Sequence, residues 1–217
     1  YDRQAKNYFS WDGTTTRNIS AKIKVPLYND EGELPDNPPA YGVMGWHEGD
    51  SAVYIYDKYD IWKVDPLAKS PMVSITKGRN TKNITRYIQL DPEKRFFSSK
   101  GDILGRSIND ETKKSGLTII DISNSHPILK NNLEDISFGQ VVTANHEFGN
   151  VMIYTKESFI NPPDLFVGNL DFVLTRPLQT ISLTDKKLSS LNPQQKEYNW
   201  GTAELFHWKA FNGKTAN

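Results

Sequence analysis

Short apolar runs, rich in β-branched and aromatic residues, alternate along the chain with Gly, Pro, Asn and Asp. Runs of this composition are typical of strands joined by tight turns. Five of them predict strands at residues 51–56, 61–64, 117–120, 150–154 and 164–167. No long segment places apolar residues at i, i+3, i+4 and i+7, the spacing of an amphipathic helix. The pattern therefore predicts an all-β fold.

Two dipeptides next to these strands suit hairpin turns. Gly49-Asp50 precedes the first predicted strand, and Gly149-Asn150 lies at the start of the fourth. Such turns need a backbone with positive φ, which Gly, Asn and Asp adopt more easily than other residues. We therefore expect a hairpin at each position.

An internal repeat is the most informative feature of the sequence. Four segments share a polar residue or Gly, then apolar residues, then Asp or Asn, at residues 7–12, 60–65, 116–121 and 164–169. Several are followed by a shorter segment that ends in Ser or Thr, at residues 18–20, 73–76 and 180–184. Residues 47–56 also resemble residues 146–154, about two repeat lengths further along the chain.

A repeating unit of roughly 40–50 residues with about four strands is typical of a β-propeller blade. One such sheet cannot bury both faces alone, so blades stack on their neighbours around an axis. We therefore predict a partial β-propeller with about three to four four-stranded antiparallel blades. A complete propeller of seven or eight blades would need about 350 residues at this repeat length. The alternative is a β-sandwich, in which turns also recur at short intervals.

Two segments interrupt the repeat. Residues 28–39 are polar and Pro-rich, which predicts a loop inserted between strands. Residues 186–197 are irregular and predict at most one helical turn. We accordingly assign residues 1–185 to propeller blades and residues 186–217 to a junction segment with the first strands that lead to a further domain.

Composition narrows the classes of function. Lys plus Arg (26) balances Asp plus Glu (26), so nothing draws the chain as a whole to nucleic acid or anionic lipid. The chain has no Cys, which excludes disulfides, thiolate metal sites and a cysteine nucleophile. No apolar stretch reaches the roughly 18–20 residues of a membrane span. Because the chain starts at Tyr1 rather than Met, we expect a piece of a longer protein with any targeting signal upstream.

Three stretches carry a resemblance to a known family. They are residues 41–46 (YGVMGW) with 56–62 (YDKYDIW) and Asp65, residues 163–167 (PDLFV), and residues 192–200 (NPQQKEYNW) with 204–205 and 211–214. In these stretches the chain resembles bacterial serine peptidases of the prolyl-oligopeptidase and dipeptidyl-peptidase type. In that family a β-propeller precedes an α/β-hydrolase domain, and the third stretch closes the propeller. The resemblance covers most of the chain and places it in the C-terminal half of the propeller.

The resemblance implies a function for the full-length protein rather than for this chain alone. A Ser-His-Asp triad in the hydrolase domain would cleave short peptides, and the propeller would admit substrates by size and help to position them. The partners implied are a peptide substrate and the hydrolase domain in cis, and the implied location is periplasmic or extracytoplasmic. The chain departs from the family by stopping at Asn217 without a hydrolase domain.

No catalytic residue is predicted in the chain itself. The nucleophile elbow of an α/β-hydrolase is G-x-S-x-G, because small flanking residues permit its strained turn. Ser51 and Ser107 have a Gly two residues earlier but lack the second Gly, so both are interpreted as turn residues. We expect the chain alone to be inactive.

No metal or cofactor site is predicted either. The four histidines are His47, His126, His146 and His207. None has the spacing of a metal-binding motif. His47-Glu48 and His146-Glu147 occupy equivalent points of the repeat, which favours a blade turn over metal ligation.

Charged residues give candidates for substrate binding, but no motif selects among them. The acidic groups are Asp30, Glu31 and Glu33, then Asp110 and Glu111, then Glu134 and Asp135. We interpret these residues as solvated loop carboxylates, although dipeptidyl-peptidase propellers use acidic residues to hold a peptide amino terminus. The arginines able to orient a peptide carbonyl are Arg79, Arg86, Arg95 and Arg106.

Two further patterns bear on other binding functions. Asn18 and Asn83 begin N-x-S/T triplets, which we interpret as ordinary strand-end residues. Trp46, Trp62, Trp200 and Trp208 are interpreted as packing between blades rather than as a sugar-binding platform. The aromatic content nevertheless keeps open a second function, a stand-alone propeller that binds protein or glycan partners. Blade faces left uncovered predict self-association of the chain, or disorder at residues 1–15.

Overall fold

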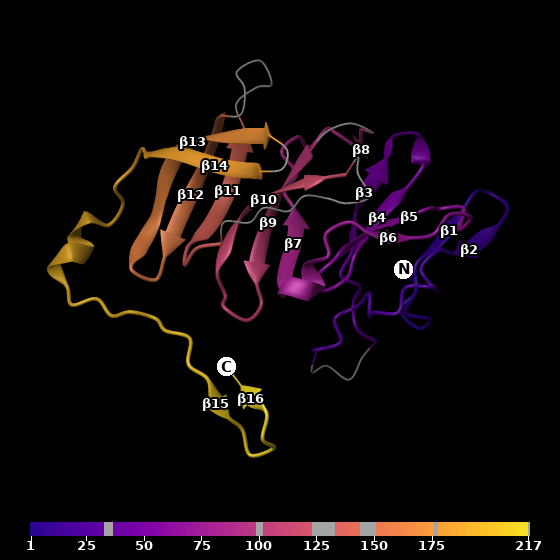
Figure 1. Cartoon of the computed structure of the whole chain (residues 1–217), viewed down its shortest axis with the longest axis horizontal. Helices are drawn as coiled ribbons and strands as arrows, with labels where there is room; N and C mark the ends of the chain where they lie inside the picture. The colour runs from indigo at the N-terminus through magenta and orange to yellow at the C-terminus, as the bar shows by residue number, and fades with distance from the viewer. Residues whose placement is uncertain (33–36, 99–101, 123–132, 144–150, 176–177, 217) are drawn as a thin grey trace.

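The computed structural model describes residues 1–32, 37–98, 102–122, 133–143, 151–175 and 178–216. Within these ranges the chain consists of β-strands, turns and short 3₁₀ helices, without an α-helix. The prediction of an all-β fold is confirmed. The described strands form several small sheets that follow one another along the chain (Figure 1).

The N-terminal part of the chain forms a hairpin and a five-stranded sheet. The hairpin pairs β1 (Phe9–Trp11) with β2 (Thr16–Asn18), so the expectation of disorder at residues 1–15 is wrong. The sheet order is β6-β5-β4-β3-β8. Its strands are β3 (Val43–His47), β4 (Val53–Tyr56), β5 (Ile61–Val64), β6 (Val73–Ser74) and β8 (Phe96–Phe97). The strand β8 lies parallel to β3, whereas the other neighbours in this sheet are antiparallel.

The turn between β3 and β4 contains a 3₁₀ helix, η1 (Glu48–Asp50). Gly49 has a φ of 70° and Asp50 a φ of 55°, so the predicted hairpin with positive φ is confirmed here. The equivalent prediction for Gly149-Asn150 lies outside the described residues.

Two antiparallel meanders follow the five-stranded sheet. The first has the order β10-β9-β7, and a 3₁₀ helix, η2 (Gly78–Thr81), precedes it. Its strands are β7 (Asn83–Tyr87), β9 (Asp102–Asn109) and β10 (Ser115–Asp121). The second has the order β11-β12-β13-β14. Its strands are β11 (Ser137–Thr143), β12 (Val151–Ser158), β13 (Asn161–Thr175) and β14 (Leu178–Lys187).

The repeated sequence segments fall on equivalent strands of successive sheets. Residues 60–65, 116–121 and 164–169 lie on or overlap β5, β10 and β13, each the third strand of its meander. The segments 18–20, 73–76 and 180–184 lie on or beside β2, β6 and β14, which pair with β1, β5 and β13. Residues 47–56 and 146–154 include β4 and β12, the second strands of two meanders. The fourth segment, residues 7–12, lies over β1 of the N-terminal hairpin, so three of the four predicted repeats occupy equivalent strands.

Strand β4 shows how one sheet is buried on both faces. Val53 and Ile55 pack with Tyr8, Ile19 and Leu27 of the N-terminal segment. The alternate residues Tyr54 and Tyr56 pack on the opposite side, in a core that includes Ile120 of the next sheet and Ile122 just after it. Alternation with a period of two directs successive side chains to opposite faces. Burial of each of these side chains contributes on the order of 1.5–3 kcal/mol.

The next core lies between the three-stranded and the four-stranded sheets. Leu117 and Ile119 of β10 pack with Phe138 of β11 and with Met152 and Tyr154 of β12. Sheets and apolar cores thus alternate along the chain. A β-sandwich has one core between two sheets, so this series of layers does not fit the sandwich alternative.

Two segments lie outside these layers. The inserted loop predicted at residues 28–39 is closed by a bridge between Tyr28 and Ala40, and its residues 33–36 lie outside the described part. After β14, residues 188–216 form an extended arm that runs away from the sheets (Figure 1). The arm contains the predicted single helical turn, η4 (Pro193–Glu197), and a hairpin of β15 (Trp208–Lys209) and β16 (Thr215–Ala216).

Candidate functional site

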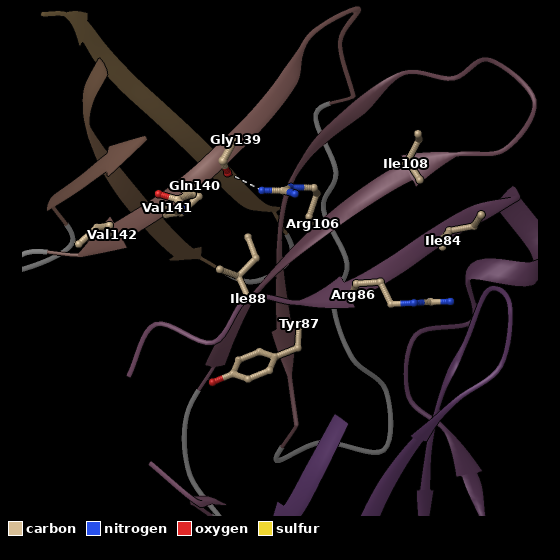
Figure 2. Close-up of a pocket in the computed structure, with 10 residues that line it drawn as sticks. All are labelled: Ile84, Arg86, Tyr87, Ile88, Arg106, Ile108, Gly139, Gln140, Val141 and Val142. Carbon is tan, nitrogen blue, oxygen red and sulfur yellow. Dashed lines mark hydrogen bonds between the residues drawn. The ribbon is translucent and has the colours of Figure 1, made fainter. Parts of the chain in front are cut away.

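A cleft of about 650 Å³ opens between the three-stranded and four-stranded sheets. Ligand pockets typically have volumes of roughly 300–1,000 Å³. Its walls come from β7, β9 and β11 and the residue after β7 (Figure 2). The lining residues are Ile84, Arg86, Tyr87, Ile88, Arg106, Ile108, Gly139, Gln140, Val141 and Val142. β7 and β11 are the first strands of their meanders, so the cleft lies where the two sheets present corresponding edges.

Arg86 of β7 and Arg106 of β9 are direct cross-strand partners. Like charges in this position repel one another. The two side chains diverge, with Arg106 reaching toward Gly139 and Arg86 extending away from it (Figure 2). Each guanidinium is held by backbone carbonyls on a different neighbouring segment. The pair therefore links the three-stranded sheet to the layers on either side.

Arg106 crosses the cleft to the four-stranded sheet. Its Nη2 donates a hydrogen bond to the carbonyl oxygen of Gly139. That carbonyl lies where the register between β11 and β12 shifts, between Phe138 and Val141. A Cβ at Gly139 would lie only 1.9 Å from the Thr155 hydroxyl, so a side chain at position 139 would force this bulge to move. The bulge and its glycine thus place an acceptor in reach of Arg106.

The Nε–H group of Arg106, unlike Nη2, forms no hydrogen bond with a described residue. It is enclosed by protein atoms and has no acceptor among the described residues. A buried donor without a partner costs about 1–3 kcal/mol. Unsatisfied groups of this kind are rare in folded proteins and call for a structural or functional reason.

Arg86 turns back toward the five-stranded sheet. Its Nη2 donates to the carbonyl oxygens of Asp57 and Lys58, each at 3.1 Å. Its guanidinium also lies 4.7 Å from the centre of the Tyr56 ring, a cation–π contact. Burial lowers the pKa of Arg86 below its usual value. Arg86 therefore has a well-defined role in joining two sheets at the edge of the cleft.

The charge of the cleft is its most specific property. Of the described residues that line it, two are arginines and none is Asp or Glu. Elsewhere in the described ranges, cations beside carboxylates form ion pairs, as in Arg79 with Asp57 and Lys58 with Asp110. Neither cleft arginine forms an ion pair with a described residue. A chain with no net charge thus contains a locally positive cleft with aliphatic walls.

A turn next to the cleft contains the densest polar network of the described chain. The fully buried Asp57 carboxylate accepts hydrogen bonds from the backbone N–H groups of Tyr59 and Asp60, from Trp62 Nε1 and from Arg79. Burial, together with the Asp57 charge, raises the pKa of Asp60. Because its bonding groups are occupied within the turn, this network stabilises the β4–β5 connection rather than offering a binding site.

The candidate histidines do not converge. His47 Nδ1 lies 2.9 Å from the Tyr54 hydroxyl, and burial followed by the Lys63 charge lowers the pKa of His47. His207 lies in the arm, and His126 and His146 fall outside the described residues. No group of three His, Asp or Glu side chains with metal-binding geometry occurs in the part of the chain that is described.

The candidate serines and acidic residues have structural partners. Ser51 donates to the carbonyl of Glu48 in a turn, and the Ser107 hydroxyl pairs with Thr85 at 2.7 Å. Among the acids, Glu31 pairs with Lys58, and Asp135 pairs with Lys114. The positions Glu33, His146 and Glu147 are not described. The structure therefore does not bring the described serines, histidines and acids together.

The four candidate tryptophans have different surroundings, and Trp46 of β3 is 36% exposed. Trp62 packs in the core between the N-terminal segment and β4, in agreement with the interpretation from sequence. Trp200 is 56% exposed and Trp208 is 47% exposed, because both belong to the arm. Packing between blades is therefore the wrong interpretation for these two residues.

Of the four candidate arginines, the structure selects Arg86 and Arg106 for the cleft. Arg79 is engaged with Asp57, and Arg95 is exposed on a connecting segment. Sequence reasoning also missed Gln140 and the Gly139 bulge, for which the only sequence signal is a Gly within an apolar strand. None of the helical turns in the described ranges has the length or apolar character needed to cross a membrane.

Comparison of the chain with protein-family models, with curated proteins and with solved structures gave no match. The layered sheets and the positive cleft are therefore the observations on which a function can be argued.

Proposed function

We propose that the chain is part of the β-propeller of a serine peptidase of the prolyl-oligopeptidase or dipeptidyl-peptidase type. In this role it does not catalyse hydrolysis but limits access by size and helps to position short peptides. The resemblance in residues 41–46, 56–62 and 192–200 motivates the proposal. The stack of small antiparallel sheets, with the sequence repeat on equivalent strands, supports it.

The single observation that carries the substrate-positioning role is the location of the cleft. In a propeller the first strand of each blade lies nearest the central channel. β7 and β11, which form two sides of the cleft, are the first strands of their meanders. A ligand in the cleft would then face the channel through which a peptide reaches the catalytic domain. Two sheets depart from the predicted four-stranded antiparallel blade: the first has the extra parallel strand β8 beside β3, and the second has three described strands.

The exposed arm supports a hydrolase domain as the partner in cis. Tyr198, Phe206 and Phe211 are 66%, 72% and 105% exposed. Its start is held by hydrogen bonds from Gln195 and Trp200 to the carbonyl oxygens of Ile160 and Phe159. Exposed apolar clusters of this kind mark interaction surfaces. In the proposed arrangement the hydrolase domain covers these aromatic side chains.

The uncovered face of the four-stranded sheet supports self-association of the isolated chain. Val142 and Ile153 are cross-strand partners and are 61% and 41% exposed. The adjacent Leu165 is 38% exposed. Because the five-stranded and three-stranded sheets each bury apolar side chains on both faces, we propose that a second copy covers this face.

The proposal is tested by reading the gene on the 3′ side of the Asn217 codon. We expect an α/β-hydrolase domain with a G-x-S-x-G motif. In the full-length protein, replacement of that Ser by Ala should abolish peptide hydrolysis while peptide binding by the present chain persists. A coding sequence that ends without such a motif overturns the peptidase assignment.

A stand-alone binding propeller is the second candidate function. The observation that favours it is the same exposed aromatic arm, which also suits a protein or glycan partner in trans. Specific, hydrolysis-independent binding on a glycan or protein array, lost when Trp200 and Trp208 are replaced by Ala, would favour this function over the first.

A further inference from the structure

The positive cleft contains a guanidinium, that of Arg106, whose charge has no carboxylate partner among the described residues. We propose that it binds the C-terminal carboxylate of a short peptide that ends in an aliphatic residue, with Arg106 as the anchoring cation. The inference rests on the proposed function, because it takes the ligand to be a peptide. It adds the chemical group that is recognised and the orientation of the peptide in the cleft.

Arg106 has the unused capacity that this role requires. A guanidinium carries five N–H donors, and among the described residues Arg106 uses Nη2 for the Gly139 carbonyl. Its Nε–H is enclosed by protein atoms, so a ligand in the cleft would be contacted by the Nη donors of this half-buried side chain. The neutral carbonyl of Gly139 satisfies part of the hydrogen bonding of Arg106 but supplies no negative charge to balance the guanidinium. A carboxylate supplies both acceptors and the opposite charge, and it matches the planar donors of a guanidinium.

The rest of the lining selects the orientation and the side chain. Because none of the described residues that line the cleft is acidic, the ammonium group of a peptide would meet the positive charges of Arg86 and Arg106 there. The carboxyl end is therefore the end that enters. Ile88, Ile108 and Val141 form an apolar wall beside Arg106, which suits an aliphatic side chain on the last residue.

Arg86 contributes as a positioning residue. Its bonds to the Asp57 and Lys58 carbonyls hold its guanidinium away from Arg106, so the two like charges do not compete for one space. The cleft consequently keeps a positive field while Arg106 alone is placed to contact the ligand.

The test measures binding to the 217-residue chain by isothermal titration calorimetry. The probes are acetyl-Ala-Ala-Leu with a free carboxylate, the same peptide with a C-terminal amide, and octanoate. The protein variants are R106M, R106K and the matched control R95M, in which an exposed arginine outside the cleft is replaced. Far-UV circular dichroism and the thermal midpoint verify that each variant folds.

We expect the free-acid peptide to bind and the amide to bind about tenfold more weakly or worse, the range for loss of a charged hydrogen-bond partner. R106M should lose a similar factor for the acid but not for the amide, R106K should lose less, and R95M should bind as the wild type does. In ¹⁵N spectra, the Arg106 Nε–H signal should shift with the acid and not with the amide.

The opposite outcomes are distinguishable. Equal binding of acid and amide with no effect of R106M overturns the carboxylate site but leaves peptide positioning intact. If octanoate binds as tightly as the free-acid peptide, the carboxylate site is supported. A peptide is then excluded as the molecule that supplies the carboxylate. If neither peptide binds, the inference and the proposed peptide-positioning role both fail. Should R106M not fold, the comparison of acid and amide on the wild type still decides the question.

Discussion

The Tyr56 hydroxyl accepts a hydrogen bond from the backbone N–H of Tyr87 at 3.1 Å. Tyr56 ends β4 of the five-stranded sheet, and Tyr87 ends β7 at the edge of the next sheet. An edge strand presents N–H groups that can pair with other chains. Here a side chain from the neighbouring layer occupies one of these groups, so the bond joins two sheets and closes part of an edge beside the cleft.

Replacement of Tyr56 by Phe should therefore destabilise the fold although the ring is kept. The Tyr87 N–H would lose its acceptor in a largely buried position, at a cost of about 1–3 kcal/mol. Urea unfolding followed by circular dichroism measures this change. The exposed Tyr198 gives the control, because Y198F removes a hydroxyl in the arm and should leave the midpoint unchanged. Equal midpoints for Y56F and the wild type would contradict the assigned bond.

The Asp57 turn should be far more sensitive to substitution than a surface carboxylate. In D57N, one carboxylate oxygen becomes an NH₂ group, which cannot accept from the groups that Asp57 binds. Removal of one member of a buried ion pair costs about 3–5 kcal/mol. We expect a loss of this size in the free energy of unfolding of D57N, measured by urea denaturation.

The matched control for D57N is D135N. The Asp135 side chain is 80% exposed in its ion pair with Lys114, and such pairs contribute about 0–1 kcal/mol. Similar losses for the two variants would show that Asp57 does not stabilise the turn as described.

The strands predicted from the sequence correspond to β4, β5, β10, β12 and part of β13, because their signal is local, whereas β7, β9 and β11 around the cleft were not predicted. β4 and β5 are short apolar runs with both faces largely buried, and β10 has the same pattern, whereas β13 has one exposed face. Hydrophobic residues every second position and turn residues at the ends are sufficient to indicate such strands. The parallel partner β8 was not predicted, because a two-residue strand carries almost no pattern of its own.

The cleft was not predictable, because its chemistry depends on contacts between distant residues. Arg79, Arg86 and Arg106 look equivalent in the sequence. Arg106 is distinguished by its hydrogen bond to the carbonyl oxygen of Gly139, 33 residues away. Arg79 is instead held by the Asp57 carboxylate, 22 residues away, and does not line the cleft. The arm tryptophans were misinterpreted for a related reason, since burial of an aromatic residue depends on which neighbouring elements cover it.

Stability at acid pH should depend on Asp110. Hydrogen bonds from Lys58, followed by those from Tyr59 and Lys113, lower the pKa of Asp110 to about 2. The unfolded chain has the usual Asp pKa of about 3.9. The ionised carboxylate is therefore favoured by the folded state. Its contribution is fully present above the unfolded pKa and is lost as the pH falls through about 2.

This pH dependence is measurable as a difference between variants. The free energy of unfolding of the wild type should exceed that of D110N most near about pH 6, and the difference should shrink by about pH 3. The control D135N should show a small difference from the wild type throughout this range. A D110N difference that stays constant with pH would contradict the lowered pKa.

Self-association of the isolated chain should depend on the uncovered face of the four-stranded sheet. Sedimentation velocity over a range of protein concentrations should show a mass that rises above that of the 24.7 kDa monomer. I153K places a charge in the centre of the exposed Val142–Ile153 patch and should shift the protein to monomer, because burial of an unpaired charge is unfavourable. L67K changes a residue that is 44% exposed elsewhere and should leave association unchanged. A wild type that stays monomeric at all concentrations, or equal effects of I153K and L67K, would exclude this face as the contact.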